Sequence, residues 1–328
     1  MKTVVLFGGS FDPIHWGHIK IAQQALIQRN ADEVWFVLNQ TSPFKEKGTS
    51  FDARYKMVEM MIKPHYPKFK ACRIDETLPT PSYAINTVEV LQKKYPDIRF
   101  EWLIGSDQIP KLHEWHRFKE FDALVQIVVY QRDENTHKYP KLSGDLIDVS
   151  STEIRNGTSL KTHRSVLNYM MSEGLYLEDM LEHRLSSERF DHTVRVTSLA
   201  LQLAECHNVS LKRVYLAAMF HDYCKENTDD AIFFNTQYPK AFDHAFAAKS
   251  LLSKSYYVFD KQVLKAIENH VSGTATNKIA QILFIADKCE LGRNYDSSPF
   301  IDLSMNNLNE GFKAVKEANQ AFNRKENE

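Results

Sequence analysis

The sequence predicts an α/β fold with a doubly wound parallel sheet in its first half and an all-α fold in its second half. Up to residue 176, short apolar runs alternate with segments of helical period, the pattern of a parallel sheet covered by helices on both faces. After residue 181 nearly every segment has helical period. Of the 11 glycines and 11 prolines, 17 lie before residue 180, which also favours a loop-rich first half and a helical second half. The chain has 328 residues, so two domains are expected, over residues 1–178 and 179–328.

Short apolar runs mark the strands of the first half. They are Val4–Phe7, Val34–Leu38, Phe100–Ile104 and Gln126–Tyr130. Helices are expected in segments such as Gly17–Arg29 and Ser82–Tyr95. Ligands of such a sheet bind at the carboxyl ends of its strands. The loops expected there are Gly8–His15, Gln40–Lys47 and Gly105–Trp115.

Six amphipathic segments account for the second half. They are Asp191–His207, Ser210–Lys225, His244–Lys254, Asp260–His270, Asn277–Glu290 and Met305–Phe322. Ser210 and Asp260 stand where helix N-caps are wanted. Glu178–Ser187 is expected to be the linker or the first helix of the second domain.

Composition excludes several classes of function. The 41 basic residues nearly cancel the 42 acidic ones, which argues against binding of nucleic acid or an anionic membrane by bulk charge. No segment approaches the ~20 apolar residues of a membrane span, and the apolar run at the amino terminus is too short for a signal peptide. The four cysteines show no paired spacing, which fits reduced thiols in a cytoplasmic protein.

A glycine turn with two histidines follows the first expected strand. Gly8 and Gly9 let the backbone bend tightly and approach a phosphate, and the following helix start offers unpaired N–H groups to anionic oxygens. His15 and His18 lie three residues apart at that helix start, so both can point at one phosphoryl group. Donors placed there would stabilise charge that develops during phosphoryl transfer. An accidental pair of histidines in a strand–turn–helix is the alternative.

The whole string G-G-S-F-D-P-I-H-W-G-H resembles that of the HxGH nucleotidyltransferases and, in this longer form, that of bacterial nicotinate-nucleotide adenylyltransferases. The resemblance continues through the first 176 residues, with matching strings at Pro43–Lys45, Ser82–Thr87, Gly105–Asp107 and Ser150–Arg155. Ala84 and Asn86 depart from the threonine and aspartate of that family.

This resemblance implies a Rossmann-like nucleotidyltransferase fold and a set of site residues. The implied catalytic residues are His15, His18, Lys45 and Arg155. The implied substrate-binding residues are Gly8, Gly9, Ser10, Phe11, Arg54, Tyr83, Asn86, Thr87, Gly105, Asp107, Trp115, Arg132, Ser150, Ser151 and Thr152. Asp107 would hold a ribose hydroxyl, Trp115 would stack near the pyridine ring, and the helix start at Ser150 would bind the β- and γ-phosphates of ATP.

The implied reaction joins ATP and nicotinate mononucleotide into the dinucleotide and releases pyrophosphate. No protein base is needed, because the phosphate of the mononucleotide is itself the nucleophile. Positioning and charge neutralisation then provide the catalysis, with Mg²⁺ on the triphosphate. Nicotinamide mononucleotide, or the substrate of another HxGH nucleotidyltransferase, is the alternative.

Histidines and aspartates continue the apolar stripes of the predicted helices in the second half. His221 follows an apolar stripe at i, i+3, i+4 and i+7, and Asp287 repeats this spacing on another segment. His192, His244 and His270 each share a face with apolar residues, and Asp222 is adjacent to His221. A single such histidine is more often a hydrogen-bonded core residue. Six converging groups favour a metal site instead, because unpaired buried carboxylates are costly.

The order of these groups resembles that of HD-domain phosphohydrolases with two metals. Residues 181–300 are similar to bacterial HD-domain hydrolases of diadenosine tetraphosphate, with matching strings around Arg189, His221, His270 and Asp287. The resemblance implies hydrolysis to two ADP by a hydroxide that the metals bridge. The implied metal ligands are His192, His221, Asp222, His244, His270 and Asp287, with Lys225 as a catalytic residue and Glu290 and Arg293 as substrate-binding residues. One or two transition-metal ions are expected, iron first, with manganese, cobalt or zinc as alternatives.

Other interpretations of the second half stay open. It could hydrolyse another nucleotide, such as a (p)ppGpp-type molecule or a cyclic dinucleotide, or it could be a degenerate HD fold that senses a nucleotide or mediates oligomerisation. A binding scaffold is the alternative for the whole chain. The expected partners are ATP, nicotinate mononucleotide and diadenosine tetraphosphate or a related nucleotide, with neither nucleic acid nor a membrane among them. Assembly into a homo-oligomer is left open.

Overall fold

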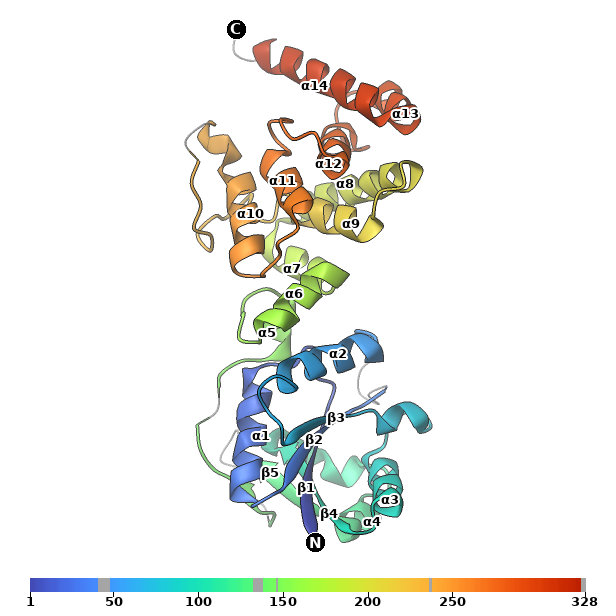
Figure 1. Ribbon diagram of the computed structural model, residues 1–328, viewed down its shortest axis with the longest axis vertical. Coiled ribbons are helices and arrows are strands. Elements are labelled where there is room, and N and C mark those ends of the chain that lie inside the picture. The colour runs from blue at the N-terminus through green and yellow to red at the C-terminus, as the bar shows by residue number, and fades with distance from the viewer. Residues whose placement is uncertain (41–47, 132–137, 146, 236–237, 326–328) are drawn as a thin grey trace. The chain divides into compact units, whose positions relative to one another are not determined.

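The computed structural model describes residues 1–40, 48–131, 138–145, 147–235 and 238–325. Its internal contacts divide the chain into two compact units (Figure 1). The first unit holds residues 1–154 and 158–166, and the second holds residues 155–157 and 167–328. The second unit therefore begins, by its internal contacts, about ten residues before residue 179, where the sequence predicts the second domain to start. The predicted domain boundary stays a prediction.

A parallel sheet forms the centre of the first unit. Its strands lie in the order β3-β2-β1-β4-β5-β6, and every neighbouring pair is parallel. The strands are β1 (Lys2–Gly9), β2 (Glu33–Leu38), β3 (Phe69–Cys72), β4 (Ile98–Gly105), β5 (Gln126–Tyr130) and β6 (Lys141–Leu142). The doubly wound parallel sheet is confirmed, and all four predicted strands are present. The two strands that the sequence did not predict, β3 and β6, are the shortest and lie at the two edges.

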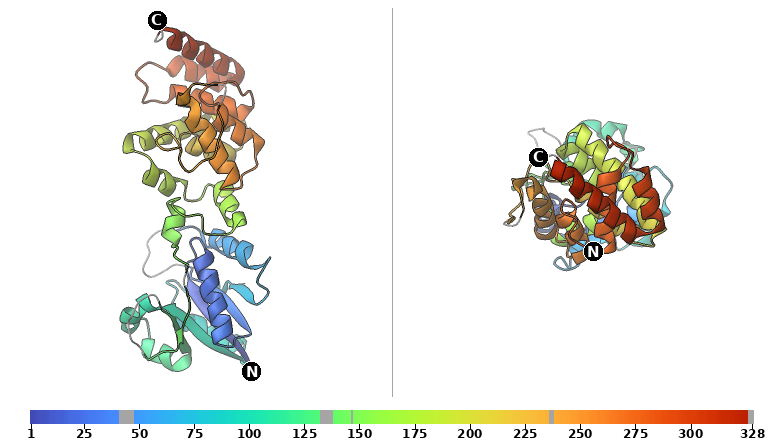
Figure 2. Two further views of the ribbon diagram at one scale, coloured as in Figure 1. Left: turned by 90° about the vertical axis from the view of Figure 1, so that its left-hand side faces the viewer. Right: turned by 90° about the horizontal axis from the view of Figure 1, so that it is seen from above.

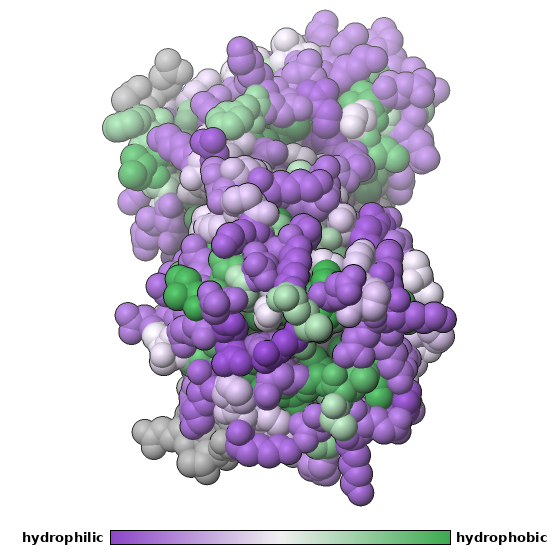
Figure 3. All heavy atoms as spheres, turned by 60° about the horizontal axis from the view of Figure 1, so that its bottom comes forward, coloured by the Kyte–Doolittle hydropathy of each residue, from purple (hydrophilic) through white to green (hydrophobic). Residues whose placement is uncertain are grey.

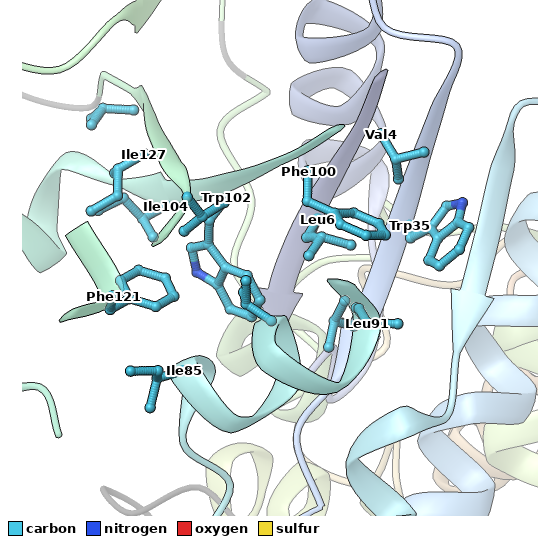
Figure 4. Packing of buried hydrophobic residues seen from close by; sticks show 14 of the residues in the cluster. Val4, Leu6, Trp35, Ile85, Leu91, Phe100, Trp102, Ile104, Phe121 and Ile127 are labelled. Carbon is cyan, nitrogen blue, oxygen red and sulfur yellow. The ribbon is translucent and has the colours of Figure 1, made fainter. Parts of the chain in front are cut away.

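Helices cover both faces of this sheet (Figure 1). They are α1 (Trp16–Gln28), α2 (Phe51–Ile62), α3 (Ala84–Lys94) and α4 (Phe118–Leu124), with the 3-10 helices η1 (Ile74–Thr77) and η2 (Ser106–Glu114). The short helix α5 (Ser151–Arg155) follows β6 along the chain. Alternate side chains of each strand point to opposite faces. Leu6 and Trp102 therefore pack toward α3 and α4, where Leu91 and Phe121 close the core (Figure 4). Their neighbours along the strands, such as Val5, are buried on the other face.

The strand order places a ligand crevice at the start of the chain. β1 lies between β2 and β4. The chain adds β2 and β3 on one side of β1 and then β4, β5 and β6 on the other side, so the direction of strand addition reverses at β1. At such a reversal point the loops at the carboxyl ends of the strands separate and open a crevice. The glycine turn at Gly8 and Gly9 ends β1 and lies at this point.

The second unit is helical. Its elements are α6 (Arg164–Glu173), which begins in the first unit, α7 (Leu177–Arg184), α8 (Ser187–Cys206), α9 (Leu211–Phe220), η3 (Lys240–Phe242), α10 (Asp243–Lys254), α11 (Lys261–Asn269), α12 (Lys278–Cys289), α13 (Ser298–Asn306) and α14 (Leu308–Lys325). The six predicted helical segments are all found. The predicted N-cap Asp260 accepts hydrogen bonds from the backbone N–H groups of Gln262 and Val263. The segment expected over Met305–Phe322 differs, because Asn307 separates α13 from α14.

Helix α12 is the central element of this unit. It contacts α8, α9, α11, α13 and α14, and Figures 1 and 2 show the last two, at the red end of the colour scale, lying beside it. Ten of its 12 residues are buried. Its apolar composition on all faces follows from this position, because a helix that is surrounded has no solvent face.

The exposed surface is predominantly polar on the face that Figure 3 shows, with smaller hydrophobic areas between hydrophilic residues. Among the described helices, none is both long enough and apolar enough to cross a membrane. All four cysteines lie in the described part of the chain, and each is a free thiol, as the sequence predicted.

Glu33 links three strands at one end of the sheet. Its carboxylate lies 2.7 Å from Lys2 Nζ on β1 and 2.8 Å from Lys70 Nζ on β3, and it accepts a hydrogen bond of 2.6 Å from Trp35 Nε1. Burial by itself would raise the pKa of Glu33. The hydrogen bonds from Lys2, Lys70 and Trp35 outweigh burial and lower the pKa from 4.5 to about 2.

We therefore expect Glu33→Gln to destabilise the first unit in a pH-dependent way. A carboxylate with a lowered pKa contributes stability above its unfolded pKa, and this contribution is lost as the pH falls toward the folded value. The difference in unfolding free energy between wild type and variant should shrink by about 1 kcal/mol between about pH 6 and about pH 3.5. Urea unfolding followed by tryptophan fluorescence measures this unit alone, because Trp16, Trp35, Trp102 and Trp115 are the four tryptophans of the chain. The exposed Asp97, changed to Asn, is the control. An equal pH dependence in wild type and Glu33→Gln would contradict the prediction.

Candidate active sites

The glycine turn after β1 is shaped by packing as well as by backbone freedom. A Cβ atom on Gly8 would lie 2.7 Å from the ring of Trp102, and one on Gly9 would lie 3.0 Å from the ring of Phe11. Any larger residue would push these rings away. Phe11 itself has a positive φ of 48° and is 2 % exposed, so it supports the turn from beneath.

The two histidines of the turn lie face to face. The rings of His15 and His18 are stacked, with centroids 3.7 Å apart and planes inclined by 27°. His15 is buried at the N-cap of α1, and its backbone N–H donates to His18 Nδ1 at 3.3 Å. A neutral imidazole that accepts at Nδ1 carries its proton on Nε2. The helix start thus fixes His18 as a donor through Nε2.

A cavity of about 570 Å³ opens at the carboxyl ends of the central strands. Seven of the predicted substrate-binding residues line it: Gly8, Gly9, Ser10, Tyr83, Gly105, Asp107 and Trp115. The structure adds lining residues that the sequence did not suggest, among them Asn39 and His116. His116 stacks on Tyr83, with ring centroids 4.4 Å apart. The cavity therefore combines an aromatic wall with the glycine turn.

The exposed carboxylate of Asp107 depends on a glycine two residues earlier. A Cβ on Gly105 would meet Asp107 Oδ1 and would lie 2.9 Å from the hydroxyl oxygen of Tyr130. Trp115, on the same side of the sheet, has a buried indole N–H without a hydrogen-bond partner among the described residues. The cavity thus offers a carboxylate acceptor and an indole donor to a ligand.

Arg54 is directed toward backbone rather than toward the cavity. Its side chain is 5 % exposed and donates to the carbonyl oxygens of Ser10 at 2.8 Å, Asn39 at 2.9 Å, Gln40 at 3.2 Å and Thr49 at 2.9 Å. These carbonyls belong to the segments that follow β1 and β2 and that lead into α2. The residue predicted to bind substrate thus joins the loops around the cavity.

Two further predicted residues lie on α3 outside the cavity lining. Thr87 is 1 % exposed, and its hydroxyl donates to Asp75 Oδ1 at 2.5 Å. Asn86 is partly buried. Burial raises the pKa of Asp75 even though Thr87 and Ser82 hydrogen-bond to it. Their predicted contacts with substrate remain predictions.

The string around Ser150 begins helix α5, as expected. The Ser150 backbone N–H and hydroxyl both donate to Glu153 Oε2, at 2.6 and 2.8 Å, and Ser151 Oγ donates to the carbonyl oxygen of Pro13 at 2.9 Å. Ser151 thereby ties the start of α5 to the turn that carries His15. Thr152 is exposed, and Arg155 Nε lies 3.8 Å from Asp179 Oδ2. Lys45 and Arg132 lie outside the described residues.

In the second unit the six predicted metal ligands converge. They come from α8 (His192), the turn after α9 (His221 and Asp222), α10 (His244), the end of α11 (His270) and α12 (Asp287). All six are buried, with exposed fractions between 0 and 7 %. Helix α9 ends at Phe220, so His221 and Asp222 leave it in a turn rather than on the longer helix that the sequence predicted.

Two groups of potential ligand atoms share Asp222. His192, His221 and Asp222 form one group and Asp222, His244 and His270 form the other, with the ligand atoms of each group within 4.8 Å of one another. Asp222 Oδ1 lies 3.2 Å from His244 Nε2 and 3.4 Å from His270 Nε2. Asp287 Oδ1 lies 3.3 Å from His192 Nε2. Each group could hold one cation, and Asp222 would then be a ligand common to both.

Hydrogen bonds on the far side of the rings set the protonation of the imidazoles. His221 Nδ1 lies 2.6 Å from the carbonyl oxygen of Ala218, and His270 Nδ1 lies 2.7 Å from that of Ile267. Each Nδ1 must donate there, which leaves the lone pair on Nε2. His221 Nε2 is buried without a hydrogen-bond partner among the described residues, and lies 3.8 Å from Asp222 Oδ2 and 4.0 Å from Asp287 Oδ1. A buried lone pair beside two carboxylates fits a metal ion.

The electrostatics agree with this assignment. Burial lowers the pKa of His221 to about 4, so its ring is neutral and able to act as a ligand near pH 7. Burial alone would raise the pKa of Asp222, but the neighbouring imidazoles of His221, His244 and His270 hold it well below its usual range. Burial alone would also raise the pKa of Asp287, but the charge of Lys288 and the neighbouring histidines outweigh burial and lower it well below its usual range. His221 thus offers a neutral nitrogen, and Asp222 and Asp287 offer ionised oxygens, the state that metal binding needs.

Four cations surround these ligands. Lys225 Nζ lies 3.3 Å from His244 Nε2, Arg189 Nη1 3.3 Å from Asp222 Oδ2, Lys288 Nζ 2.8 Å from Asp287 Oδ2 and Arg293 Nη2 3.0 Å from Asp287 Oδ1. Lys225 and Arg293 were predicted as site residues, whereas Arg189 and Lys288 were not. Arg189 is one turn from His192 on α8, which is the signal that could have identified it.

Two buried cysteines, Cys224 and Cys289, lie close in sequence to ligand residues of this site. Burial raises the pKa of the Cys224 thiol to about 12 and that of the Cys289 thiol to about 11. Neither belongs to a group of potential ligand atoms among the described residues. Both are buried in the core.

Comparisons with known proteins match each unit. Residues 6–157 match the family model described as Cytidylyltransferase-like, and residues 189–292 match that of the HD domain. A Mycoplasma genitalium protein named probable nicotinate-nucleotide adenylyltransferase/Ap4A hydrolase is 29 % identical over 314 residues, which are 90 % of this chain and 89 % of that protein. The Bacillus subtilis nicotinate-nucleotide adenylyltransferase is 34 % identical over 54 % of this chain and 99 % of its own length.

Among solved structures, a Plasmodium falciparum nicotinic acid mononucleotide adenylyltransferase complexed with NaAD covers 54 % of this chain and 98 % of its own, at 19 % identity and a TM-score of 0.46. The identity and coverage of the Bacillus subtilis relative place the first unit in its family. This chain belongs to the nicotinate-nucleotide adenylyltransferase family and carries an HD domain after its nucleotidyltransferase unit.

Proposed function

We propose that the first unit transfers the adenylyl group of ATP to nicotinate mononucleotide, giving nicotinate adenine dinucleotide and pyrophosphate. The observation that carries this proposal is the stacked pair His15 and His18, with His18 held as a donor at the start of α1. The names of the relatives and the cavity beside the glycine turn support it.

In this reaction a phosphate oxygen of the mononucleotide attacks the α-phosphorus of ATP. A new P–O bond forms, the bond from that phosphorus to the bridging oxygen breaks, and pyrophosphate leaves with the electron pair. Mg²⁺ bound to the triphosphate would neutralise charge on the leaving group. The Nε2–H of His18 and the backbone N–H groups at the start of α1 would stabilise the charge that develops on the transferred phosphoryl oxygens.

Other residues would place the two substrates. The aromatic wall of Tyr83, His116 and Trp115 would hold the pyridine ring, and Asp107 would accept a hydrogen bond from a ribose hydroxyl. Lys45, Arg132, Arg155 and the start of α5 at Ser150–Thr152 would bind phosphates. Nicotinamide mononucleotide is the competing substrate, and it differs from the proposed one by the charge of one ring substituent.

His18→Ala should lower kcat for adenylyl transfer by about 10²- to 10³-fold and change KM by only a few-fold, because the lost donor acts mainly on charge present in the transition state. Pyrophosphate release, measured in parallel with nicotinate and nicotinamide mononucleotide, reports this change and decides between the two substrates. His113→Ala is the matched control, since His113 is exposed on η2. Near-normal transfer by His18→Ala would remove the proposed role.

We further propose that the second unit hydrolyses diadenosine tetraphosphate symmetrically to two ADP in a metal-dependent reaction. The two ligand groups that share Asp222 carry this proposal. When bound, iron or another transition metal would activate the attacking water and polarise a phosphoryl oxygen. Water oxygen bonds to the second phosphorus of the chain, the bridging oxygen departs with the third, and a proton is released. Two ADP molecules result.

The cations around the ligands support a polyphosphate substrate. Arg189, Lys288 and Arg293 contact the carboxylates Asp222 and Asp287 in the described structure. Metal ions bound to these carboxylates would take over their charge compensation, which leaves the cations available to phosphate oxygens. Several cations in one site suit a linear chain of phosphates better than a single phosphodiester.

His221→Ala should abolish hydrolysis of diadenosine tetraphosphate and reduce the metal content of the purified protein, because it removes a ligand nitrogen from the buried site. Adenylyl transfer should stay unchanged, and His18→Ala should show the reverse pattern. Elemental analysis and the two assays measure both properties. Wild-type protein with neither metal nor hydrolysis would overturn the enzyme proposal and favour a nucleotide-sensing HD domain.

Arg189→Ala and Lys288→Ala should each raise KM for diadenosine tetraphosphate about tenfold, since each removes a charge-assisted hydrogen bond worth roughly 1.5 kcal/mol. Steady-state kinetics on metal-loaded protein test this. Lys249→Ala is the control, because Lys249 pairs with Glu268 on the helical surface. Unchanged KM in both variants would show that these cations only neutralise the ligand carboxylates.

A further inference from the structure

Glu290 is a buried carboxylate that none of the ligand groups includes. It stands at the C-terminal end of α12 and is 2 % exposed. Its Oε1 lies 3.2 Å from Nδ1 of His192. Its Oε2 accepts two hydrogen bonds of 2.6 Å, from Arg195 Nε and from the backbone N–H of Gly292. Both oxygens of this carboxylate therefore have defined and different partners.

Arg195 reaches Glu290 from the helix that carries His192. The two residues are three apart on α8 and so lie on one face of it. The guanidinium occupies space that only a glycine at position 292 leaves open, because a Cβ there would lie 2.6 Å from both Nε and Nη2 of Arg195. Arg293 is more distant from the same carboxylate, with its Nε 3.8 Å from Oε1. Arg195 is thus the cation in closest contact with Glu290.

We propose that Arg195 is a positioning residue for the metal site: with the Gly292 N–H it anchors Glu290, and Glu290 in turn orients His192. Two donors on Oε2 hold the carboxylate so that Oε1 faces the His192 ring. His192 Nδ1 then donates to Oε1, which leaves the lone pair on Nε2, 3.3 Å from Asp287 Oδ1. A carboxylate behind a histidine ligand fixes its tautomer and ring orientation and strengthens its binding to metal.

A second arginine–carboxylate pair of the same unit, Arg213 and Asp260, differs from Arg195 and Glu290 in the burial of its carboxylate. Arg213 contacts Asp260 through two hydrogen bonds of 2.7 Å, and its side chain is 38 % exposed, against 40 % for Arg195. Asp260, however, is 32 % exposed and caps α11, whereas Glu290 is buried against a metal ligand. Arg213 is therefore a matched control with the same chemistry and no link to the site.

The test measures metal affinity rather than activity. Mn²⁺ is titrated into metal-depleted full-length protein, and free Mn²⁺ is followed by its electron paramagnetic resonance signal. Arg195→Ala should bind the ion roughly 10- to 100-fold more weakly than wild type, the range for loss of such support behind a ligand. Arg195→Lys should recover most of the affinity, because an ammonium can still donate to Oε2, and Arg213→Ala should bind like wild type.

Wild-type affinity in Arg195→Ala would overturn the proposal, and so would an equal loss in Arg213→Ala. Gly292→Ala provides a second route if Arg195→Ala does not fold, because the added methyl group displaces the guanidinium while all charges remain. It should weaken Mn²⁺ binding in the same direction, and wild-type affinity in it would also overturn the proposal.

This inference rests on the proposed function only in one respect: both assume that a metal ion binds at the ligand group that contains His192. Hydrolysis of diadenosine tetraphosphate by the wild type is assayed separately. If hydrolysis is absent while Arg195→Ala still weakens Mn²⁺ binding, the proposed function fails and this inference stands. If the wild type hydrolyses the substrate while Arg195→Ala keeps wild-type affinity, the proposed function stands and this inference fails.

Discussion

Two buried carboxylates, Asp222 and Asp287, impose the organisation of the helical unit. An ionised group away from water must be paired or must bind a metal, and here each faces imidazole nitrogens and at least one cation. Compensation on this scale needs side chains from five helices or their ends to meet at one place. The central position of α12 follows, because it must carry Asp287 into the interior while α8, α9 and α11 close around it.

The first unit builds its candidate site from backbone rather than from buried charged side chains. Its cavity lies where loops follow parallel strands, and helix starts supply N–H groups that are oriented by the fold. Gly8 leaves space that the buried ring of Trp102 occupies, and Gly105 lies close to the hydroxyl of Tyr130, so a Cβ at either position would meet a neighbouring aromatic side chain. The uneven distribution of glycine along the chain reflects this difference between a site built on turns and one built on helix faces.

The sequence predicted those features of the fold and the sites that depend on residues close together along the chain. Helical period placed His192, His244 and Asp287 on inward faces, and four strands were recognised from short apolar runs. Edge strands such as β3 were not predicted, because four residues are too few to show a recognisable alternation of apolar and polar side chains. The link between Arg195 and Glu290 spans 95 positions, and nothing in either neighbourhood indicates it. Arg54 shows another limit, since residue type alone does not reveal the carbonyl oxygens that its guanidinium contacts, and its predicted contact with substrate remains a prediction.

Arg54 also bears on how freely the loops around the cavity can change over evolution. Four hydrogen bonds of Arg54 to described residues end on main-chain carbonyls, which every amino acid possesses. A substitution at Gln40 or Thr49 therefore keeps the carbonyl oxygen that Arg54 contacts. The loops can therefore keep this main-chain support while their side chains change.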